Sequence, residues 1–433
     1  MRIGTITRAS ALAVAVLLTA SGCGISMGTG GGQGGGGEVS GAADGSITFQ
    51  TWNLKTEYAD FFEELIDEFE KENPGSQVRW VDQPAEGYAD KLSADAAAES
   101  LPDVVNVAPD LVHPLARAGA VLELEEARPG AAEAYLPDAW ESFAMPGMDG
   151  VYAYPWYLNT GPVFYNRELF EQAGLDPDDP PSTFDELFDQ ALRMAEETGG
   201  ETAMLGQTPG IIDLGMYGSQ LMNGEGTEFT FNDAPAVEMV QRYREMYEAG
   251  ALVPEALTQD YTGTGEQFMS GALAWAPGSA YDLENFRTNA PGLYENVGIT
   301  EVLTNTGKAN MYLQGVAVSA ATEEPATATA FAEFVTGAAQ QEAFAREVQI
   351  FPSTAGSLED PYFTEDDGTD EGRVRVAAAA QLESAASYNP VLFNDQMKNL
   401  LRDEIALAVK GDKSPRQALD DAVDRCNELL GEG

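Results

Sequence analysis

The chain has 433 residues, with 71 acidic and 23 basic side chains and a formal net charge of −48. Because so acidic a surface repels the phosphate backbone, we expect no nucleic-acid partner. One histidine, His113, and two cysteines exclude zinc sites that are built on paired histidines or on several cysteines. We therefore expect neither a metal nor another cofactor, with calcium in the acidic loop over 365–371 as the alternative that stays open.

The first 23 residues have the organisation of an export signal. Arg2 and Arg8 precede an apolar run over 9–20, which is too short to span a bilayer but suits a signal peptide. The small residues before Cys23 resemble a bacterial lipobox, in which the cysteine thiol is lipidated and becomes the N-terminus. We expect a signal peptide over 1–22, a lipid on Cys23 and a location at the outer face of the cytoplasmic membrane. The alternative is an ordinary cleaved signal with an incidental cysteine.

A flexible tether and an alternation of strands and helices follow. Glycine occupies 11 of the 23 positions from 24 to 46, so the segment 23–46 is predicted to join the anchor to the folded body. Alternating apolar residues predict strands over 47–52, 77–81 and 103–107. Apolar residues three and four apart predict helices over 57–71 and 88–100. This order predicts the α/β class, with mostly parallel sheets flanked by helices.

The rest of the chain continues the alternation. Further strands are predicted within 152–165 and over 272–276, 297–303 and 312–318. Helices are predicted over 169–174, 183–197, 214–222, 234–249, 266–270, 326–335, 340–346, 374–384, 393–409 and 415–430. Sheets of this class bind ligands at the carboxyl ends of their strands.

Several segments, taken in order, resemble one family. They are 69–75 at the end of the first predicted helix, 101–105, 115–124, 154–160, 164–170 and 181–187. Together with the export signal they resemble the extracellular solute-binding proteins of ABC importers, in the large sugar-binding family that includes maltose-binding protein. The likeness runs from about residue 47 to 430.

This resemblance implies a two-lobe fold of the periplasmic-binding-protein type (type II), which closes on its ligand about a hinge. The first lobe would hold 47–155 and 310–352, and the second 156–309 and 353–433. The chain would cross between lobes near Pro155, Lys308 and Pro352. The implied function is capture of a sugar, first of all an oligosaccharide, and its delivery to the transmembrane subunits of an ABC permease. The resemblance implies that the protein acts as a monomer and that it is not an enzyme, since no covalent bond of the sugar is made or broken.

A sugar presents apolar C–H faces and many hydroxyl groups, so its site needs aromatic planes beside amides and carboxylates. At the strand ends these are Trp52, Asn53, Asp82, Gln83 and Asp110, although either acid could instead cap the helix that follows. Near the first crossover they are Trp156, Tyr157 and Asn159, unless one of these aromatic rings belongs to the hinge core. The remaining candidates, placed by the resemblance or by nearby glycines, are Tyr217, Gly278, Ser279, Tyr281, Gln314, Asn389 and Phe393.

Other functions stay open at this point. A binding protein could take a non-sugar solute such as a glycerol phosphate ester or an osmolyte, although a phosphate ester favours a basic cleft. A sensor could use the same two lobes. A secreted glycosidase could use a pair among the 71 acidic residues, but no motif places two carboxylates at a recognisable catalytic position.

Overall fold

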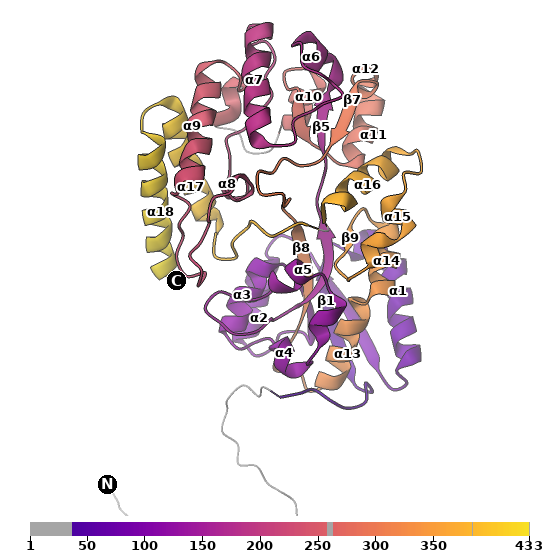
Figure 1. Ribbon diagram of the computed structural model, residues 1–433. Helices are drawn as coiled ribbons and strands as arrows, with labels where there is room; N and C mark the ends of the chain where they lie inside the picture. Colours follow the sequence, from indigo (N-terminus) through magenta and orange to yellow (C-terminus); the bar gives the residue numbers. More distant parts are fainter. Residues whose placement is uncertain (1–36, 258–262, 383, 433) are drawn as a thin grey trace, which may run out of the picture. The chain divides into compact units, whose positions relative to one another are not determined.

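The structure is a computed structural model that describes residues 37–257, 263–382 and 384–432 (Figure 1). The expected signal peptide, Cys23 and the first part of the tether lie outside the described residues. Within the described ranges, no helix is long and apolar enough to cross a membrane.

The first sheet has six strands in the order β2-β1-β3-β8-β4-β9. β1 pairs with β2 and β3 in parallel, whereas the β3–β8, β4–β8 and β4–β9 pairs are antiparallel. The bounds are β1 Ser46–Trp52, β2 Gln77–Gln83, β3 Val104–Val107, β4 Tyr154–Asn159, β8 Tyr312–Val318 and β9 Phe351–Pro352.

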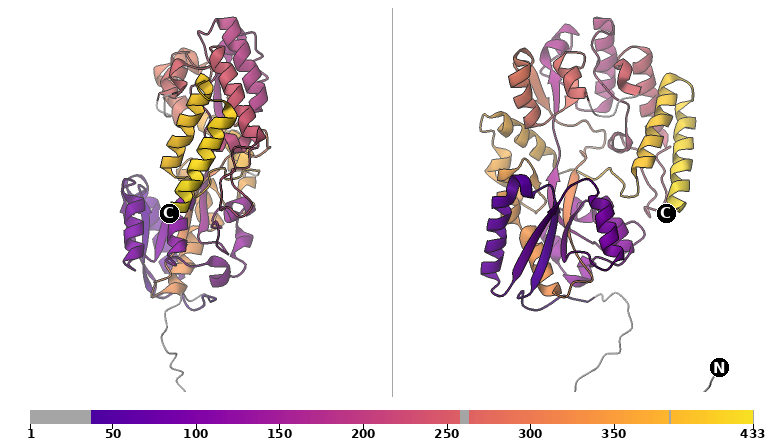
Figure 2. Two further views of the ribbon diagram at one scale, coloured as in Figure 1. Left: turned by 90° about the vertical axis from the view of Figure 1, so that its left-hand side faces the viewer. Right: turned by 180° about the vertical axis from the view of Figure 1, so that it is seen from behind.

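Helices cover both faces of this sheet, as the right-hand view of Figure 2 shows for its indigo and purple parts. Alternation along β1 directs Phe49 to one face, where its ring lies 5.1 Å from that of Phe331, and Trp52 to the other, 6.2 Å from the ring of Tyr88. The helices of this part are α1 Lys55–Glu72, α2 Tyr88–Ala97, α3 Pro109–Arg117, α4 Leu124–Ala127, α5 Pro137–Glu141, α13 Pro325–Val335, α14 Ala338–Glu347 and α15 Pro361–Thr364.

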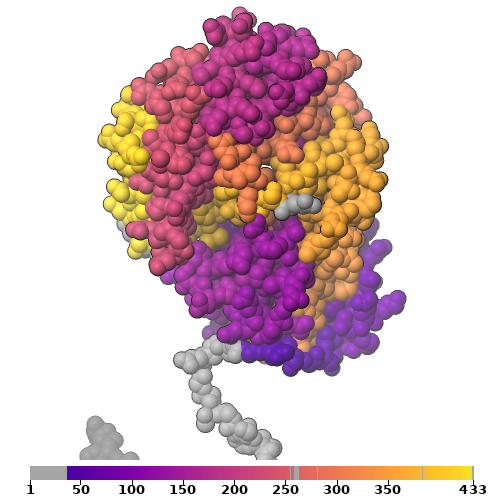
Figure 3. Space-filling view, viewed as in Figure 1, coloured from indigo at the N-terminus to yellow at the C-terminus, as the bar shows by residue number. Residues whose placement is uncertain are grey.

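The second sheet has three strands in the order β6-β5-β7, and both of its pairs are antiparallel. Its strands are β5 Val163–Asn166, β6 Trp275–Pro277 and β7 Val297–Thr300. Helices α9, α17 and α18 pack on one another, and the crimson α9 and yellow α18 are visible at the surface in Figure 3. The helices are α6 Arg167–Gln172, α7 Phe184–Thr198, α8 Ile211–Tyr217, α9 Ala234–Glu248, α10 Thr264–Met269, α11 Ala280–Asn289, α12 Pro291–Tyr294, α16 Asp370–Leu382, α17 Asp395–Lys410 and α18 Pro415–Glu432.

Two hydrophobic cores accompany the two sheets. The first takes buried side chains from 47–158 and 311–385, and the second from 163–303, Val374 and 393–426. We call these groups of residues the first and second lobes. Helix α16 contributes Val374 to the second core and Ala378 and Leu382 to the first, so it belongs to both.

The structure confirms the α/β class but differs from the sequence predictions in three details. Five of the seven strand pairings among the described residues are antiparallel, so the expected predominance of parallel pairing is wrong. The helix predicted over 214–222 is α8, which ends earlier because Gly218 adopts a left-handed conformation with φ of 114°. The strand predicted over 272–276 is β6, Trp275–Pro277.

Candidate functional site

The carboxyl ends of four strands and the amino end of a fifth meet at one edge of the first sheet. Trp52 pairs with Gln83 where β1 and β2 end, and Tyr312 pairs with Asn159 where β8 begins and β4 ends. Val107, the last residue of β3, pairs with Gly315 of β8. We call this the strand-end edge, and it is where sheets of this class place ligands.

The chain also crosses between the lobes at this edge. Thr160, directly after β4, donates a hydrogen bond from its hydroxyl to the backbone oxygen of Asn310, directly before β8, at 3.3 Å. Asn310 forms an isolated bridge with Ala386, and its Oδ1 accepts the backbone N–H of Tyr388 at 2.9 Å. The three crossing segments therefore lie side by side near 160, 310 and 386. The crossover predicted near Pro155 lies slightly later, and the one predicted near Pro352 is wrong, because Pro352 belongs to β9 of the first sheet.

Asn310 is expected to hold these crossings together. Its side chain is 5% exposed, and replacement by alanine leaves the N–H of Tyr388 without its acceptor. We expect Asn310→Ala to lower the free energy of unfolding by about 1–3 kcal/mol in urea titrations. The exposed Asn289 of α11 provides a control, since Asn289→Ala should change the free energy of unfolding by less than about 0.5 kcal/mol. Equal stability of the two variants would contradict this role.

Trp52, Asn53 and Gln83 lie at the strand-end edge, as the sequence predicts. Trp52 is partly exposed and Asn53 is exposed. Asn53 has a φ of 52°, a conformation that asparagine tolerates better than most residues, and its Oδ1 accepts the N–H of Ala85 at 3.2 Å. The turn after β1 is thus tied to the turn after β2, which holds these side chains in place.

The two predicted acids have mainly structural partners. Asp82 accepts hydrogen bonds from the hydroxyl of Thr51 at 2.6 Å and from the backbone N–H groups of Leu54 and Lys55 at 3.2 and 3.1 Å. It therefore binds the start of α1, which precedes it in the chain, and does not cap the helix that follows it, α2, as the alternative from the sequence had it. Asp110 is exposed in the first turn of α3.

Trp156 does not lie where a ligand could reach it. Its side chain is 1% exposed, and its ring packs against Phe49, Phe62 and Phe344 of the first core at centroid distances of 6.1, 5.9 and 5.8 Å. The predicted contact of Trp156 with a ligand is therefore corrected to a core role. Its neighbour Tyr157 is half-buried against the same core, whereas Asn159 is exposed at the end of β4.

Of the predicted turn after β6, only Tyr281 presents an unengaged surface. A Cβ on Gly278 would lie 2.3 Å from the ring of Phe164, so this glycine allows close packing of strands. The hydroxyl of Ser279 donates to Asp282 at 2.6 Å in the cap of α11. Tyr281 is 78% exposed, and the turn lies beside the first crossover because Gly278 donates its N–H to the oxygen of Pro162 at 3.0 Å.

The remaining predicted residues are spread over the second lobe and the crossings. Tyr217 is buried and donates to Asp185 at 3.0 Å, and Phe393 is buried against Phe229, 5.5 Å away. Both are core residues here, so their predicted ligand contacts are corrected. Asn389 is half-buried near the third crossover, and Gln314 is half-buried on β8.

Sequence reasoning missed four residues at the strand-end edge. Tyr312 opens β8 directly after a crossover and is 58% exposed, so its aromatic ring at a strand start was an available signal. Tyr88 donates its hydroxyl to the backbone oxygen of Asn106 at 2.8 Å, and Asn106 Nδ2 donates to Gln314 Oε1 at 3.1 Å. Gln50 is buried on β1. Burial raises the pKa of Tyr88 above its usual value, so its hydroxyl stays protonated as a donor at neutral pH.

Charges near this edge favour an uncharged ligand over an anion. Asp82 and Glu86 flank the end of β2, and Asp110 follows β3. The ammonium of Lys55 lies 4.8 Å from the centre of the Trp80 ring, and Lys308 pairs with Asp138 at 2.9 Å, which raises the pKa of Lys308. These two cations are thus engaged with protein groups.

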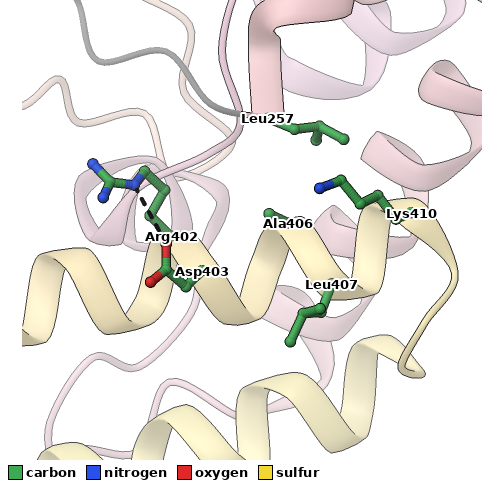
Figure 4. Close-up of a pocket in the computed structure, with 6 residues that line it drawn as sticks. All are labelled: Leu257, Arg402, Asp403, Ala406, Leu407 and Lys410. Atoms are coloured by element: carbon green, nitrogen blue, oxygen red, sulfur yellow. Dashed lines mark ion pairs between the residues drawn. The ribbon is translucent and has the colours of Figure 1, made fainter.

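A pocket of about 450 Å³ lies elsewhere, on α17 (Figure 4). Lys410 and Leu257 extend toward it, while Arg402 lies 3.8 Å from Asp403. It contains none of the residues that the sequence singled out, and we assign it no ligand.

The acidic loop over 365–371 is held by an ion pair between Asp367 and Arg375 at 3.1 Å, and the described residues hold no group of three or more potential metal ligands.

The sequence profile of the bacterial extracellular solute-binding proteins matches residues 54–342, which is most of the chain. The protein belongs to this family. The match begins after β1 and runs through β8 and into α14, so it includes the ends of β2, β3 and β4, the start of β8 and the first two crossovers, but not Trp52 and Asn53.

Individual relatives agree with this assignment. The sn-glycerol-3-phosphate-binding periplasmic protein UgpB of Salmonella typhimurium is 27% identical over 297 residues, 64% of this chain and 66% of that protein. A provisionally assigned oligosaccharide periplasmic-binding protein from Synechococcus sp. MITs9220 has a TM-score of 0.74 and 26% identity, covering 89% of this chain and 99% of that one. The cyclic alpha-maltosyl-1,6-maltose binding protein from Arthrobacter globiformis has a TM-score of 0.72 over 90% of this chain and 99% of its own, and at 21% identity it is similar in fold.

Proposed function

We propose that this protein is the substrate-binding component of an ABC importer and that it binds a sugar, first of all an oligosaccharide, at the strand-end edge. The observation that carries the proposal is that all three crossings between the lobes lie at the edge where β1–β4 end. A ligand there contacts both lobes, so its affinity for the closed state drives closure about the crossings. Delivery to the permease then follows from recognition of that closed state.

The sugar class rests on the exposed and partly exposed side chains around this edge. Trp52, Tyr281 and Tyr312 offer aromatic surfaces, and Asn53, Gln83 and Asn159 offer amides. This pairing of ring and amide suits a neutral, hydroxyl-rich ligand. The relative from Synechococcus, provisionally assigned as an oligosaccharide-binding protein, supports the same class.

A glycerol phosphate ester is the second candidate, because UgpB proteins of several bacteria are among the relatives. A phosphate group favours arginine or lysine donors in its site. The acids Asp82, Glu86 and Asp110 near the edge argue against it. Direct competition between sn-glycerol 3-phosphate and neutral saccharides separates the two candidates.

We also propose that Cys23 carries a lipid that anchors the protein at the outer face of the cytoplasmic membrane. In cells fed an alkyne-tagged palmitate, Cys23→Ala should abolish labelling, because Cys426, the other cysteine, is buried in the second core. Burial raises the pKa of the Cys426 thiol to about 12, which keeps it unreactive. Cys426→Ala is the matched control and should label fully. Label that persists in Cys23→Ala would contradict the anchor.

A further inference from the structure

A hairpin of the second lobe, residues 222–229, is fixed firmly to that lobe. The backbone N–H of Asn223 donates to the oxygen of Glu228 at 2.8 Å, which closes the turn. Phe229, at the end of the hairpin, is buried in the second core. Asn427 of α18 holds its backbone on both sides, since Oδ1 accepts the N–H of Phe229 at 2.8 Å and Nδ2 donates to its oxygen at 3.0 Å. The hairpin therefore moves together with the second lobe.

A loop of the first lobe, residues 145–150, is fixed in the same way. Met145 is 2% exposed in the first core, and its backbone oxygen accepts the N–H of Met148 at 3.1 Å. The hydroxyl of Tyr152 donates to the backbone oxygen of Asp149 at 2.9 Å. This loop therefore moves together with the first lobe.

The hairpin and the loop touch at Gly226 and Pro146, outside the three crossings. A Cβ on Gly226 would lie 3.1 Å from Cβ and 3.5 Å from Cγ of Pro146. Gly224, Glu225 and Thr227 of the same turn are exposed, whereas Gly226 is partly buried. Figure 3 shows the crimson part of the second lobe reaching the purple part of the first. Only a residue without a side chain fits here without displacing its neighbour.

Such a contact depends on how the two lobes are arranged. Each partner is held by its own lobe, so a rotation of the lobes about the crossings separates them or presses them together. Packed protein surfaces do not compress, so the lobes cannot approach further at this point once the two residues meet. The contact therefore belongs to one end of the motion.

We propose that Pro146 and Gly226 form a closure stop, a contact that is made when the lobes close and that limits how far they close. The stop rests on the lobe closure of the proposed function, and it adds a determinant of affinity that the ligand does not touch. A bulkier residue at 226 holds the lobes slightly apart. Because apparent affinity falls with the fraction of molecules that can close, such a residue weakens binding from outside the site.

The first test is Gly226→Ala, with Gly199→Ala as the matched control. The two glycines have φ of 67° and 63°, so alanine strains the backbone equally at both, but a Cβ on Gly199 meets nothing within 4 Å. Both variants should shift the midpoint of urea unfolding by a similar amount. In calorimetric titration with the tightest neutral oligosaccharide, Gly226→Ala should bind about threefold to tenfold more weakly, and Gly199→Ala should stay within about twofold.

A second substitution separates the stop from a local disturbance of the hairpin. Pro146→Gly removes the two atoms that the new Cβ would meet, so the double variant Gly226→Ala/Pro146→Gly should recover the affinity of Pro146→Gly alone. Unchanged affinity in Gly226→Ala, or no recovery in the double variant, overturns the stop.

A cross-link tests the contact without any ligand. In a Cys23→Ala background, Pro146→Cys/Gly226→Cys places two Cβ atoms close to the separation of about 3.5–4.5 Å found in disulfides, and Cys426 is buried. Mild oxidation should form the intramolecular bond, and small-angle X-ray scattering should give a smaller radius of gyration for the oxidised than for the reduced form. Failure to form the bond, or equal radii, overturns the stop. If the unaltered protein binds no saccharide, the sugar proposal fails, and this comparison alone supports or overturns the stop.

Discussion

Replacing Trp156 by alanine should lower the free energy of unfolding by about 3–5 kcal/mol. Its indole ring is 1% exposed and contacts the rings of Phe49, Phe62 and Phe344, which come from β1, α1 and α14. Truncation leaves a cavity where these elements meet, and the close-packed surroundings relax only in part. Chemical denaturation monitored by far-UV circular dichroism measures the loss.

The control for this prediction is Trp52→Ala. Trp52 is partly exposed at the end of β1, so its removal should cost clearly less stability while weakening saccharide binding. Trp156→Phe should fall between Trp156→Ala and the unaltered protein, because an aromatic ring remains in the cavity. If Trp156→Ala kept full stability and lost only sugar binding, the ring would reach the ligand and the core role would be wrong.

Tyr281→Ala and Tyr312→Ala should each weaken oligosaccharide binding about tenfold. The two rings are 78% and 58% exposed, they lie beside different crossings, and they come from different lobes. We expect both rings to stack against sugar faces when the lobes close. Loss of about 1.4 kcal/mol of binding free energy with one ring corresponds to a tenfold loss of affinity. Because the Tyr281 side chain is 78% exposed in the free protein, Tyr281→Ala should change the free energy of unfolding by less than about 0.5 kcal/mol.

The matched variants are Tyr281→Phe and Tyr312→Phe, which keep the ring and should retain most of the affinity. Since phenylalanine keeps the aromatic ring and alanine removes it, comparing the two variants at each position measures the contribution of the ring to affinity. Unchanged calorimetric affinity in both alanine variants would remove these tyrosines from the site.

The first lobe was largely predictable because its signals are local. The alternation before Trp52 and the apolar stripe of Phe62, Leu65, Ile66 and Phe69 define β1 and α1 with no tertiary information. Asn73-Pro74-Gly75 marks the helix end. The same local signals cannot report pairing direction, which is why the antiparallel β8 and β4 were not foreseen.

The site was harder to predict, since it depends on the direction in which each side chain points and on contacts between segments far apart in the sequence. Between Pro155 and Tyr157 the pairing of β4 with β8 shifts register, and this irregularity accompanies the inward position of Trp156. The third crossover depends on the bridge between Asn310 and Ala386, 76 residues apart in the chain. No local pattern marks either feature.

The central claim is that a neutral saccharide binds at the strand-end edge. The most direct test is calorimetric titration of the folded body, residues 37–433, with neutral oligosaccharides and separately with sn-glycerol 3-phosphate. We predict saturable heat with at least one oligosaccharide and none with the phosphate ester. The tightest oligosaccharide, at 100 times its dissociation constant, should add about 2.7 kcal/mol to the free energy of unfolding. Tight binding of sn-glycerol 3-phosphate, with no heat from any saccharide, would contradict the account.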